Sequence, residues 1–114
     1  MNVWVATGSS LNLKTSLKKG KWGVNKRLKK TWEKVANGDL LFFYVTSPVR
    51  GIVGLASVEG KAIEESILRH DEAVVGRVLY PYRILFKPLF MLNEDKWKTD
   101  RIRLRTLTLV LGRV

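Results

Sequence analysis

The sequence predicts an α+β domain, a mostly antiparallel barrel or half-barrel of about six short strands with two or three short flanking helices. Three observations lead to this prediction. The chain has 114 residues, which is the size of one domain. Short apolar runs with strand character recur along it and are separated by turn residues. Helical periodicity is confined to short charged segments between those runs.

The N-terminal part predicts one strand followed by one helix. Residues 1–6 are largely apolar, with Val, Trp and Val in succession, and indicate a strand. Ser9 or Ser10 is a suitable N-cap for a helix over residues 11–19. Gly20 fits the C-cap of that helix, because glycine readily adopts the left-handed conformation found there.

The middle of the chain predicts a second helix and the centre of the sheet. Residues 22–37 carry apolar residues at helical spacing and indicate a basic helix. Residues 40–45 form a continuous apolar run, which is typical of a central strand. Residues 52–58 return as its partner, and Gly54 within them indicates a bulge or a close approach by another group.

The C-terminal half is more polar at first. Residues 62–69 fit one short helix, and residues 77–79 a brief strand. Residues 83–86 predict a further strand, which Pro88 ends or marks as an edge strand. The alternating tail over residues 102–111 predicts a last strand, and a change of phase near Thr106 indicates a bulge.

Composition narrows the class of protein. The chain has no cysteine and a single histidine, which excludes disulfides, thiolate metal sites and sites built on several histidines. We expect no metal and no cofactor. There is no apolar run of the roughly 18 residues that a membrane span needs, and the start lacks the features of a signal peptide. We therefore expect a cytoplasmic protein without a membrane partner.

The charge is large and unevenly distributed. The net charge is +11, with a pI near 10.3, and a field of this size favours polyanionic partners. The alternative is a basic face that only confers solubility. The basic residues concentrate in one segment, and as candidate phosphate ligands we name Lys14, Lys18, Lys19, Lys21, Lys26, Arg27, Lys29 and Lys30.

Catalytic constellations are scarce. Ser66, His70 and Asp71 could form a triad on paper, but adjacent His and Asp residues rarely reach the required geometry. The neighbours Glu64 and Glu65 point in different directions on a helix and make a poor acid–base pair. His70 fits an exposed residue at a helix end. We expect no enzymatic activity and no catalytic residue.

The four tryptophans differ in their surroundings. Trp4 and Trp32 have apolar partners and fit the core. Trp97, between two lysines, fits either a stacking surface or a lid on the core. Trp22 stands between Lys21 and Gly23 in a basic, polar segment. A flat ring beside flexible backbone and positive charge suits the stacking of a nucleic-acid base, so a site is favoured over the core for Trp22.

Several segments, in this order, resemble the EVE domain. They read Gly20-Lys21-Trp22-Gly23-Val24, then Gly38-Asp39-Leu40-Leu41-Phe42-Phe43-Tyr44, then Ile52-Val53-Gly54-Leu55-Ala56, then Leu79-Tyr80-Pro81-Tyr82-Arg83. The resemblance extends over roughly residues 1–92. EVE domains belong to the PUA-like group and are relatives of the YTH readers of methylated adenine. The resemblance thus implies a single PUA-like pseudo-barrel over residues 1–114, atypical from about residue 93.

The resemblance also implies a pocket for one flipped, modified nucleobase. Trp22 matches the tryptophan that stacks on the base, and Gly23 and Val24 match the backbone beside it. The segment after the first strand matches the part that reads the base edge, namely Thr7, Gly8, Ser9 and Ser10, with Asn12 close by. A second cage aromatic is missing from residues 59–78, and Tyr80 or Tyr82 could replace it.

The sequence therefore predicts a nucleic-acid-binding module that reads a single base in RNA or DNA. Two alternatives stay open: an enzyme acting on a modified base or nucleotide, and a basic protein-interaction subunit. Because an apolar terminal strand without a partner would invite aggregation, we also consider a homodimer.

Overall fold

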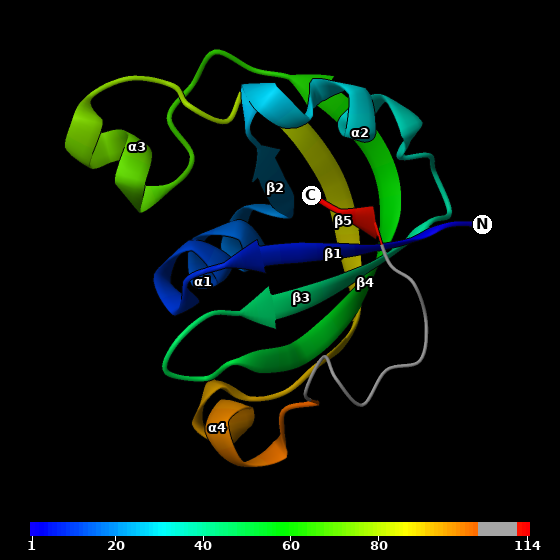
Figure 1. Ribbon diagram of the computed structural model, residues 1–114, viewed down its shortest axis with the longest axis vertical. Coiled ribbons are helices and arrows are strands. Elements are labelled where there is room, and N and C mark those ends of the chain that lie inside the picture. Colours follow the sequence, from blue (N-terminus) through cyan, green and yellow to red (C-terminus); the bar gives the residue numbers. More distant parts are fainter. Residues whose placement is uncertain (103–111) are drawn as a thin grey trace.

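The computed structural model describes residues 1–102 and 112–114, and within them a six-stranded sheet curls into a half-barrel (Figure 1). The strands are β1 (Val3–Gly8), β2 (Lys21–Val24), β3 (Leu40–Val45), β4 (Gly51–Ile63), β5 (Tyr82–Met91) and β6 (Gly112–Arg113). Their order is β2-β5-β4-β3-β1-β6. Strand β1 is parallel to β3 and β6, and the other pairs are antiparallel. The predicted α+β class is confirmed, with a mixed sheet.

Four short α-helices flank the sheet in the described part of the chain, where two or three were predicted. They are α1 (Ser10–Lys19), α2 (Lys29–Lys34), α3 (His70–Val75) and α4 (Trp97–Asp100), with 3₁₀ turns at Lys26–Leu28 and Glu94–Lys96. Helix α1 follows β1 directly, and α2 and α4 lie at opposite ends of the sheet (Figure 1). The first helix agrees closely with prediction: the Ser9 hydroxyl caps it, and Gly20 ends it with φ of 66°. Within residues 1–102 and 112–114, no helix is long and apolar enough to cross a membrane.

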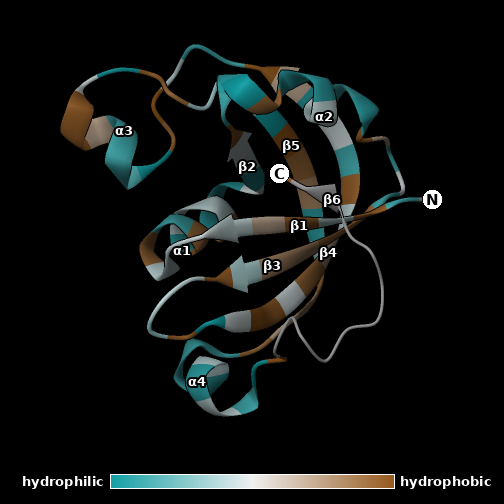
Figure 2. Ribbon diagram, in the orientation of Figure 1, coloured by the Kyte–Doolittle hydropathy of each residue, from teal (hydrophilic) through white to brown (hydrophobic). Residues whose placement is uncertain are grey.

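The core fills the concave side of the sheet. Along β3 the residues Leu41, Phe43 and Val45 are fully buried and alternate with half-buried ones, as the two-residue period of a strand requires. Figure 2 shows the strands as the more hydrophobic elements and helices α1 and α4 as more hydrophilic. The core positions predicted for Trp4 and Trp32 are confirmed, at 7% and 8% exposure.

A buried carboxylate joins the N-terminus to the turn before β3. Asp39 accepts hydrogen bonds from the amide of Asn2, the indole of Trp4 and the amide of Ala36, each at 2.9 Å. Burial opposes ionisation of Asp39, but these donors outweigh it and hold its pKa below the ordinary value. Asp39, in the turn before β3, therefore anchors the first strand.

The predicted second helix over residues 22–37 is only partly correct. Residues 21–24 form strand β2 instead, which pairs with β5 in the register Trp22↔Ile84 and Val24↔Tyr82. Helix α2 begins only at Lys29. The helical spacing of Leu28, Trp32 and Val35 belongs to the 3₁₀ turn, to α2 and to its C-cap. It did not extend to residues 21–24, whose structure is decided by pairing with a distant strand.

The helix predicted over residues 62–69 is wrong. Strand β4 continues to Ile63, because the long strand β5 offers it partners as far as Tyr82. Of the three apolar residues that such a helix would pack inward, Ile63 and Ile67 are 61% and 47% exposed, and only Leu68 is buried. Helix α3 begins at His70, and no strand forms over residues 77–79. His70 is exposed at the start of that helix, as predicted.

The predictions for Pro88 and Gly54 had different outcomes. Pro88 does not end its strand, but it does lie on an edge, because β2 pairs with β5 only as far as Leu85. It lies opposite Ala56 next to a register shift, where a residue without an amide hydrogen is tolerated. The close approach predicted at Gly54 is confirmed, because a Cβ there would lie 2.0 Å from the sulfur of Met91. The predicted tail strand and the bulge near Thr106 fall outside the described residues, apart from Ile102, which bridges Ile52.

Candidate nucleic-acid interface

A cavity of about 230 Å³ opens where the ends of β1 and β2 meet the loops on either side of them. The turn after β2 and the segments that precede and follow α3 complete its wall. Its lining consists of Thr7, Trp22, Gly23, Asn25, Arg27, Leu28, Arg69, Tyr80 and Val114. Four of the predicted base-binding residues are in this set: Thr7, Trp22, Gly23 and Tyr80. The fold thus brings together residues that are 73 positions apart in the sequence.

Trp22 forms one wall of the cavity but is not the open platform that the sequence predicted. Its side chain is 2% exposed, and its ring lies 6.0 Å from that of Phe43. A Cβ on Gly8 would lie 2.8 Å from the tip of the indole, so only glycine leaves room for the ring there. The prediction of a polar, open setting is wrong because the alternation of β2 turns Trp22 inward, whereas its basic neighbours lie at the surface.

The indole N–H of Trp22 nevertheless differs from those of the other three tryptophans. Trp4, Trp32 and Trp97 donate theirs to Asp39, to the carbonyl of Arg83 and to the carbonyl of Leu92. For Trp22, no such hydrogen bond is found among the residues that the structure describes. A buried indole usually finds a partner, and a ligand in the cavity that Trp22 lines is a candidate for that partner.

Thr7 provides a second polar group without a partner. Its hydroxyl is buried and makes no hydrogen bond within residues 1–102 and 112–114. Because buried polar groups are nearly always hydrogen-bonded, an exception beside a cavity calls for an explanation. Thr7 and Trp22 line the same cavity and together offer two donors and one acceptor to a small polar ligand.

Six predicted base-binding residues do not line this cavity: Gly8, Ser9, Ser10, Asn12, Val24 and Tyr82. Gly8 lies against Trp22, and Ser9 caps α1. The ring of Tyr82 lies 5.0 Å from that of Trp32, so it is Tyr80 alone that the fold brings to the cavity.

Four lining residues were not predicted from the sequence, and Arg69 is the charged one among them; the others are Asn25, Leu28 and Val114. Its guanidinium carbon lies 3.9 Å from the ring centre of Tyr80 and 5.7 Å from that of Trp22. The Tyr80 hydroxyl donates to Asp71 at 2.6 Å. Burial and this hydrogen bond raise the pKa of Tyr80 above its ordinary value of 10.0. No pattern in the sequence pointed to Arg69, because this residue fell at the end of a wrongly predicted helix.

Glu72 fixes the two chain segments that carry Arg69 and Tyr80. One carboxylate oxygen accepts from the amides of Leu68 and Arg69, at 3.0 and 2.9 Å, and the other from those of Leu79 and Tyr80, at 2.7 and 3.0 Å. Burial opposes ionisation of Glu72, but the four amides outweigh it and hold its pKa below the ordinary value of 4.5. This carboxylate, with no exposed surface, therefore shapes one wall of the cavity.

The predicted phosphate ligands divide into two groups. Lys14 and Lys21 form ion pairs with Glu94 and Glu64. The other six are exposed: Lys18, Lys19, Lys26, Arg27, Lys29 and Lys30. Of these, Arg27 lines the cavity itself.

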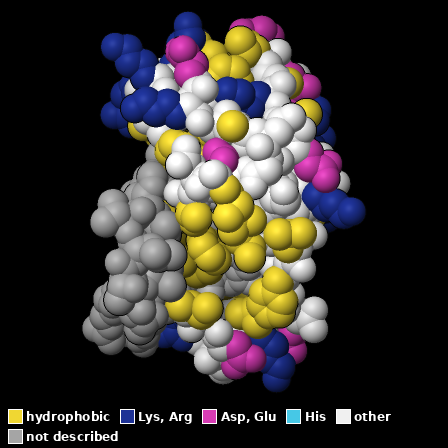
Figure 3. Space-filling view, turned by 90° about the vertical axis from the view of Figure 1, so that its right-hand side faces the viewer, with side chains coloured by type: hydrophobic (Ala, Val, Ile, Leu, Met, Phe, Trp, Pro, Cys, Tyr) yellow, Lys and Arg dark blue, Asp and Glu magenta, His cyan; other side chains and the backbone are white. Residues whose placement is uncertain are grey.

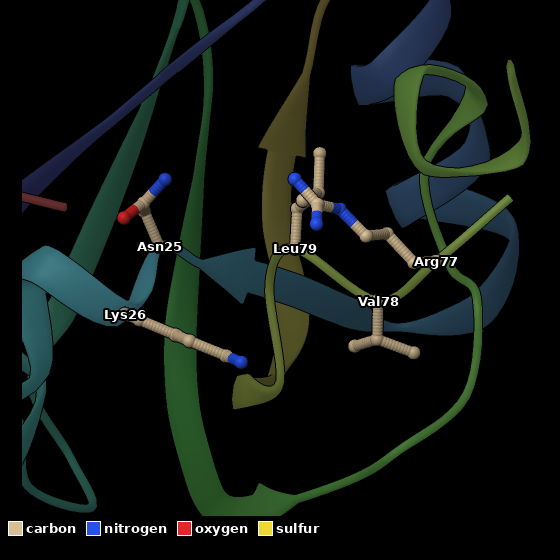
Figure 4. Close-up of a pocket in the computed structure, with 5 residues that line it drawn as sticks. All are labelled: Asn25, Lys26, Arg77, Val78 and Leu79. Carbon is tan, nitrogen blue, oxygen red and sulfur yellow. The ribbon is translucent and has the colours of Figure 1, made fainter. Parts of the chain in front are cut away.

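A neighbouring cavity of about 300 Å³ shares Asn25 with the first one. Figure 4 shows Asn25 and Lys26 on one side of it and Arg77, Val78 and Leu79 on the other. Both basic side chains are exposed. Positive charge therefore extends from the small cavity to its neighbour, a distribution that suits a phosphate backbone running past a bound base.

The residues once considered for catalysis have other contacts. Asp71 accepts from Tyr80 and lies 3.4 Å from Arg69 Nε, so it is engaged away from His70. Glu64 pairs with Lys21, whose hydrogen bond outweighs burial and lowers the carboxyl pKa. Both carboxylates serve as partners of cations.

A third cavity, of about 370 Å³, is apolar and lies elsewhere on the sheet. Its lining includes Phe42, Val53, Leu55, Phe90 and Leu92. On the face shown in Figure 3, hydrophobic side chains gather beside the atoms drawn in grey. A surface of this kind is typical of protein contacts rather than of nucleic-acid binding.

The curled mixed sheet with a small cavity beside β1 and β2 defines a domain of the PUA-like class. The EVE domain family model matches residues 2–106, and the chain belongs to that family. The predicted resemblance is thereby confirmed. No curated protein has a significantly similar sequence.

Similar solved structures include YTH domains. The YTH domain of Zygosaccharomyces rouxii MRB1 protein, in complex with N6-methyladenosine RNA, is 22% identical with a TM-score of 0.53, over 95% of this chain and 65% of that one. The YTH domain of mmi1, in an RNA complex, is 13% identical with a TM-score of 0.56, over 91% and 71%. A protein from Pseudomonas syringae is 20% identical with a TM-score of 0.51, over 81% and 70%. These similarities establish the fold.

Proposed function

We propose that this EVE domain is a non-catalytic nucleic-acid reader that accepts one flipped, modified base in the cavity beside Thr7 and Trp22. Single-stranded RNA is the first substrate to test, because similar YTH structures hold RNA. The observation that carries the proposal is that Thr7 and Trp22 line one cavity. Among residues 1–102 and 112–114, the buried Thr7 hydroxyl has no hydrogen-bond partner, and no hydrogen bond of the Trp22 indole N–H is found. A base edge supplies the donors and acceptors that these groups lack.

The size of the cavity supports a single base. Pockets for drug-sized ligands occupy roughly 300–1,000 Å³, so about 230 Å³ suits one small ring system. Trp22 forms a wall, Tyr80 faces it across Arg69, and the exposed Lys26 and Arg27 contact the phosphates. The phosphate contacts add affinity that is independent of sequence and sensitive to salt.

The test uses Thr7→Val, which removes the hydroxyl while keeping the shape of the side chain. Trp22→Ala is less informative, because deleting a buried tryptophan costs about 3–5 kcal/mol of stability. Binding of short single-stranded RNA and DNA, with and without a modified base, is measured by fluorescence anisotropy at low salt. A net hydrogen bond contributes about 0.5–1.5 kcal/mol, so we expect T7V to weaken binding roughly 2- to 12-fold. The matched control is Thr31→Val in helix α2, which we expect to bind normally.

Two results would overturn the proposal. Equal affinities of T7V and wild type would show that the base does not reach this cavity. No binding of any oligonucleotide at low salt would exclude the reader role and favour the protein-interaction alternative. The apolar cavity lined by Phe42 and Phe90 favours that alternative, and the homodimer remains a prediction that sedimentation equilibrium tests. Cytoplasmic localisation likewise remains a prediction.

A further inference from the structure

Arg69 belongs to the segment of residues 59–78, in which a second cage aromatic is missing, and its guanidinium packs on two aromatic rings of the cavity. It stacks 3.9 Å from the ring centre of Tyr80 and lies over Trp22 at 5.7 Å. The side chain is only 12% exposed, although it lines the cavity. A base that enters the cavity therefore meets a cation packed against two aromatic rings, and a guanidinium presents its N–H donors in its own plane.

One edge of this guanidinium is already engaged. With the Asn12 side chain in the orientation that pairs donors with acceptors, its carbonyl oxygen accepts from Arg69 Nη2 at 2.8 Å and from Nε at 3.2 Å. Asp71 lies 3.4 Å from the same Nε. These contacts fix the plane and the rotation of the group, and Tyr80 supports it from one face.

The opposite edge makes no hydrogen bond to the part of the chain that the structure describes. A guanidinium has five N–H donors and no acceptor, and the contacts to Asn12 use one donor on Nε and one on Nη2. For Nη1, no hydrogen bond is found to any described residue. One N–H of Nη1 and one of Nη2 thus remain side by side, a fork that matches two adjacent acceptors.

The backbone that carries Arg69 is fixed as well. Glu72 accepts from the Arg69 amide at 2.9 Å and, through its other oxygen, from the Tyr80 amide at 3.0 Å. Both sides of the Arg69–Tyr80 stack are therefore tied to one buried carboxylate. A pre-organised fork loses little conformational freedom on binding, which makes its hydrogen bonds more discriminating.

We propose that Arg69 makes the cavity selective for a base with two adjacent hydrogen-bond acceptors, as guanine presents at O6 and N7 whether or not it is modified elsewhere on the base. The inference rests on the proposed reader function and names its ligand class. An amino or methylamino group in the same place, as in adenine or N6-methyladenine, would direct a donor at the donors of Arg69. Good bidentate contacts discriminate against a wrong base by roughly 5- to 150-fold.

The experiment compares guest bases in one oligonucleotide. A short single-stranded RNA with uniform flanks carries guanine, 7-deazaguanine, adenine or N6-methyladenine at its centre, and the dissociation constants are measured at low salt. Guanine is expected to bind at least about fivefold more tightly than the others. The comparison with 7-deazaguanine is the sharpest, because the shape is kept and only the N7 acceptor is removed. It uses the wild-type protein and depends on no variant.

Variants assign the preference to Arg69. Arg69→Met is expected to abolish the difference between guanine and 7-deazaguanine, and Arg69→Lys to reduce it, because an ammonium has no planar fork. The matched control is Arg77→Met, which removes one positive charge from the neighbouring cavity. This control is expected to weaken the binding of all four RNAs by a similar factor.

The outcomes separate this inference from the function on which it rests. Binding of all four RNAs with equal affinity, or an undiminished guanine preference in R69M, would overturn the role of Arg69 and leave the reader function standing. Absence of binding to every RNA at low salt would overturn both. Guanine preference that is lost in R69M and kept in R77M would support the proposal.

Discussion

Replacing Glu72 by glutamine tests how the wall of the cavity is held. The carboxylate serves two chain segments at once, with one oxygen on the amides of Leu68 and Arg69 and the other on those of Leu79 and Tyr80. Glutamine has only one carbonyl oxygen. Its amide nitrogen would face two N–H donors, so one of the two segments must lose its partner.

The expected loss of stability is large for one substitution. Leaving a buried N–H unpaired costs about 1–3 kcal/mol, so two of them cost about 2–6 kcal/mol. Domains have a total stability of about 5–15 kcal/mol. At 4–8 °C per kcal/mol, we expect the melting temperature of E72Q to fall by at least about 8 °C. If only the segment around α3 is released, the loss appears as local opening.

Urea denaturation followed by tryptophan fluorescence measures the global effect, and amide hydrogen exchange measures the local one. The matched control is Glu65→Gln, since Glu65 is an exposed glutamate only seven positions away. We expect E65Q to stay within about 0.5 kcal/mol of wild type. The reasoning is refuted if E72Q is as stable as E65Q and the amides of Leu79 and Tyr80 exchange no faster.

Four further predictions follow from the structure. Because folding lowers the pKa of Glu72, the stability that this carboxylate contributes is complete above its ordinary pKa of 4.5 and is lost as the pH falls through its pKa in the folded protein. The difference in stability between wild type and E72Q, measured by urea titration, should therefore shrink on acidification. Thr7→Val should not lower the melting temperature, since it removes a buried hydroxyl without a described partner; a clear loss would indicate a hidden hydrogen bond. Gly54→Ala should lower the free energy of unfolding in urea by about 1–3 kcal/mol, because the new Cβ would lie 2.9 Å from the Phe90 carbonyl oxygen. Gly60→Ala in the same strand should lower it little, because the nearest atom to that Cβ lies at 3.5 Å. Lys26→Met should reduce the slope of log affinity against log salt for single-stranded RNA by about 0.7, and an unchanged slope would remove Lys26 from the phosphate contacts.

The N-terminal elements could be predicted because their determinants are local. Ser9 and Gly20 bound the first helix through their own capping chemistry, and the apolar run of residues 40–45 is buried as a central strand. The errors occurred where partners distant in sequence decide. Strand β2 exists because β5 pairs with it, and β4 extends to Ile63 for the same reason. Periodicity within a short window cannot detect such pairing.

The candidate site was predictable in part. The family motifs led to Thr7, Trp22, Gly23 and Tyr80, which the fold gathers around one cavity. The burial of Trp22 could not be anticipated from its basic neighbours, because a strand places adjacent residues on opposite faces. The network around Arg69 and Glu72 joins a helix start to a later loop through buried hydrogen bonds. These bonds have no signature in residue spacing.

The most direct test of the central claim is an NMR titration of the ¹⁵N-labelled protein with a short single-stranded RNA. The account predicts that the indole N–H of Trp22 and the amides of Gly23 and Asn25 shift most, while those of Leu55 and Leu92, beside the apolar cavity, stay in place. Shifts confined to the surface lysines, with the Trp22 indole unmoved, would contradict the claim that a base enters the cavity.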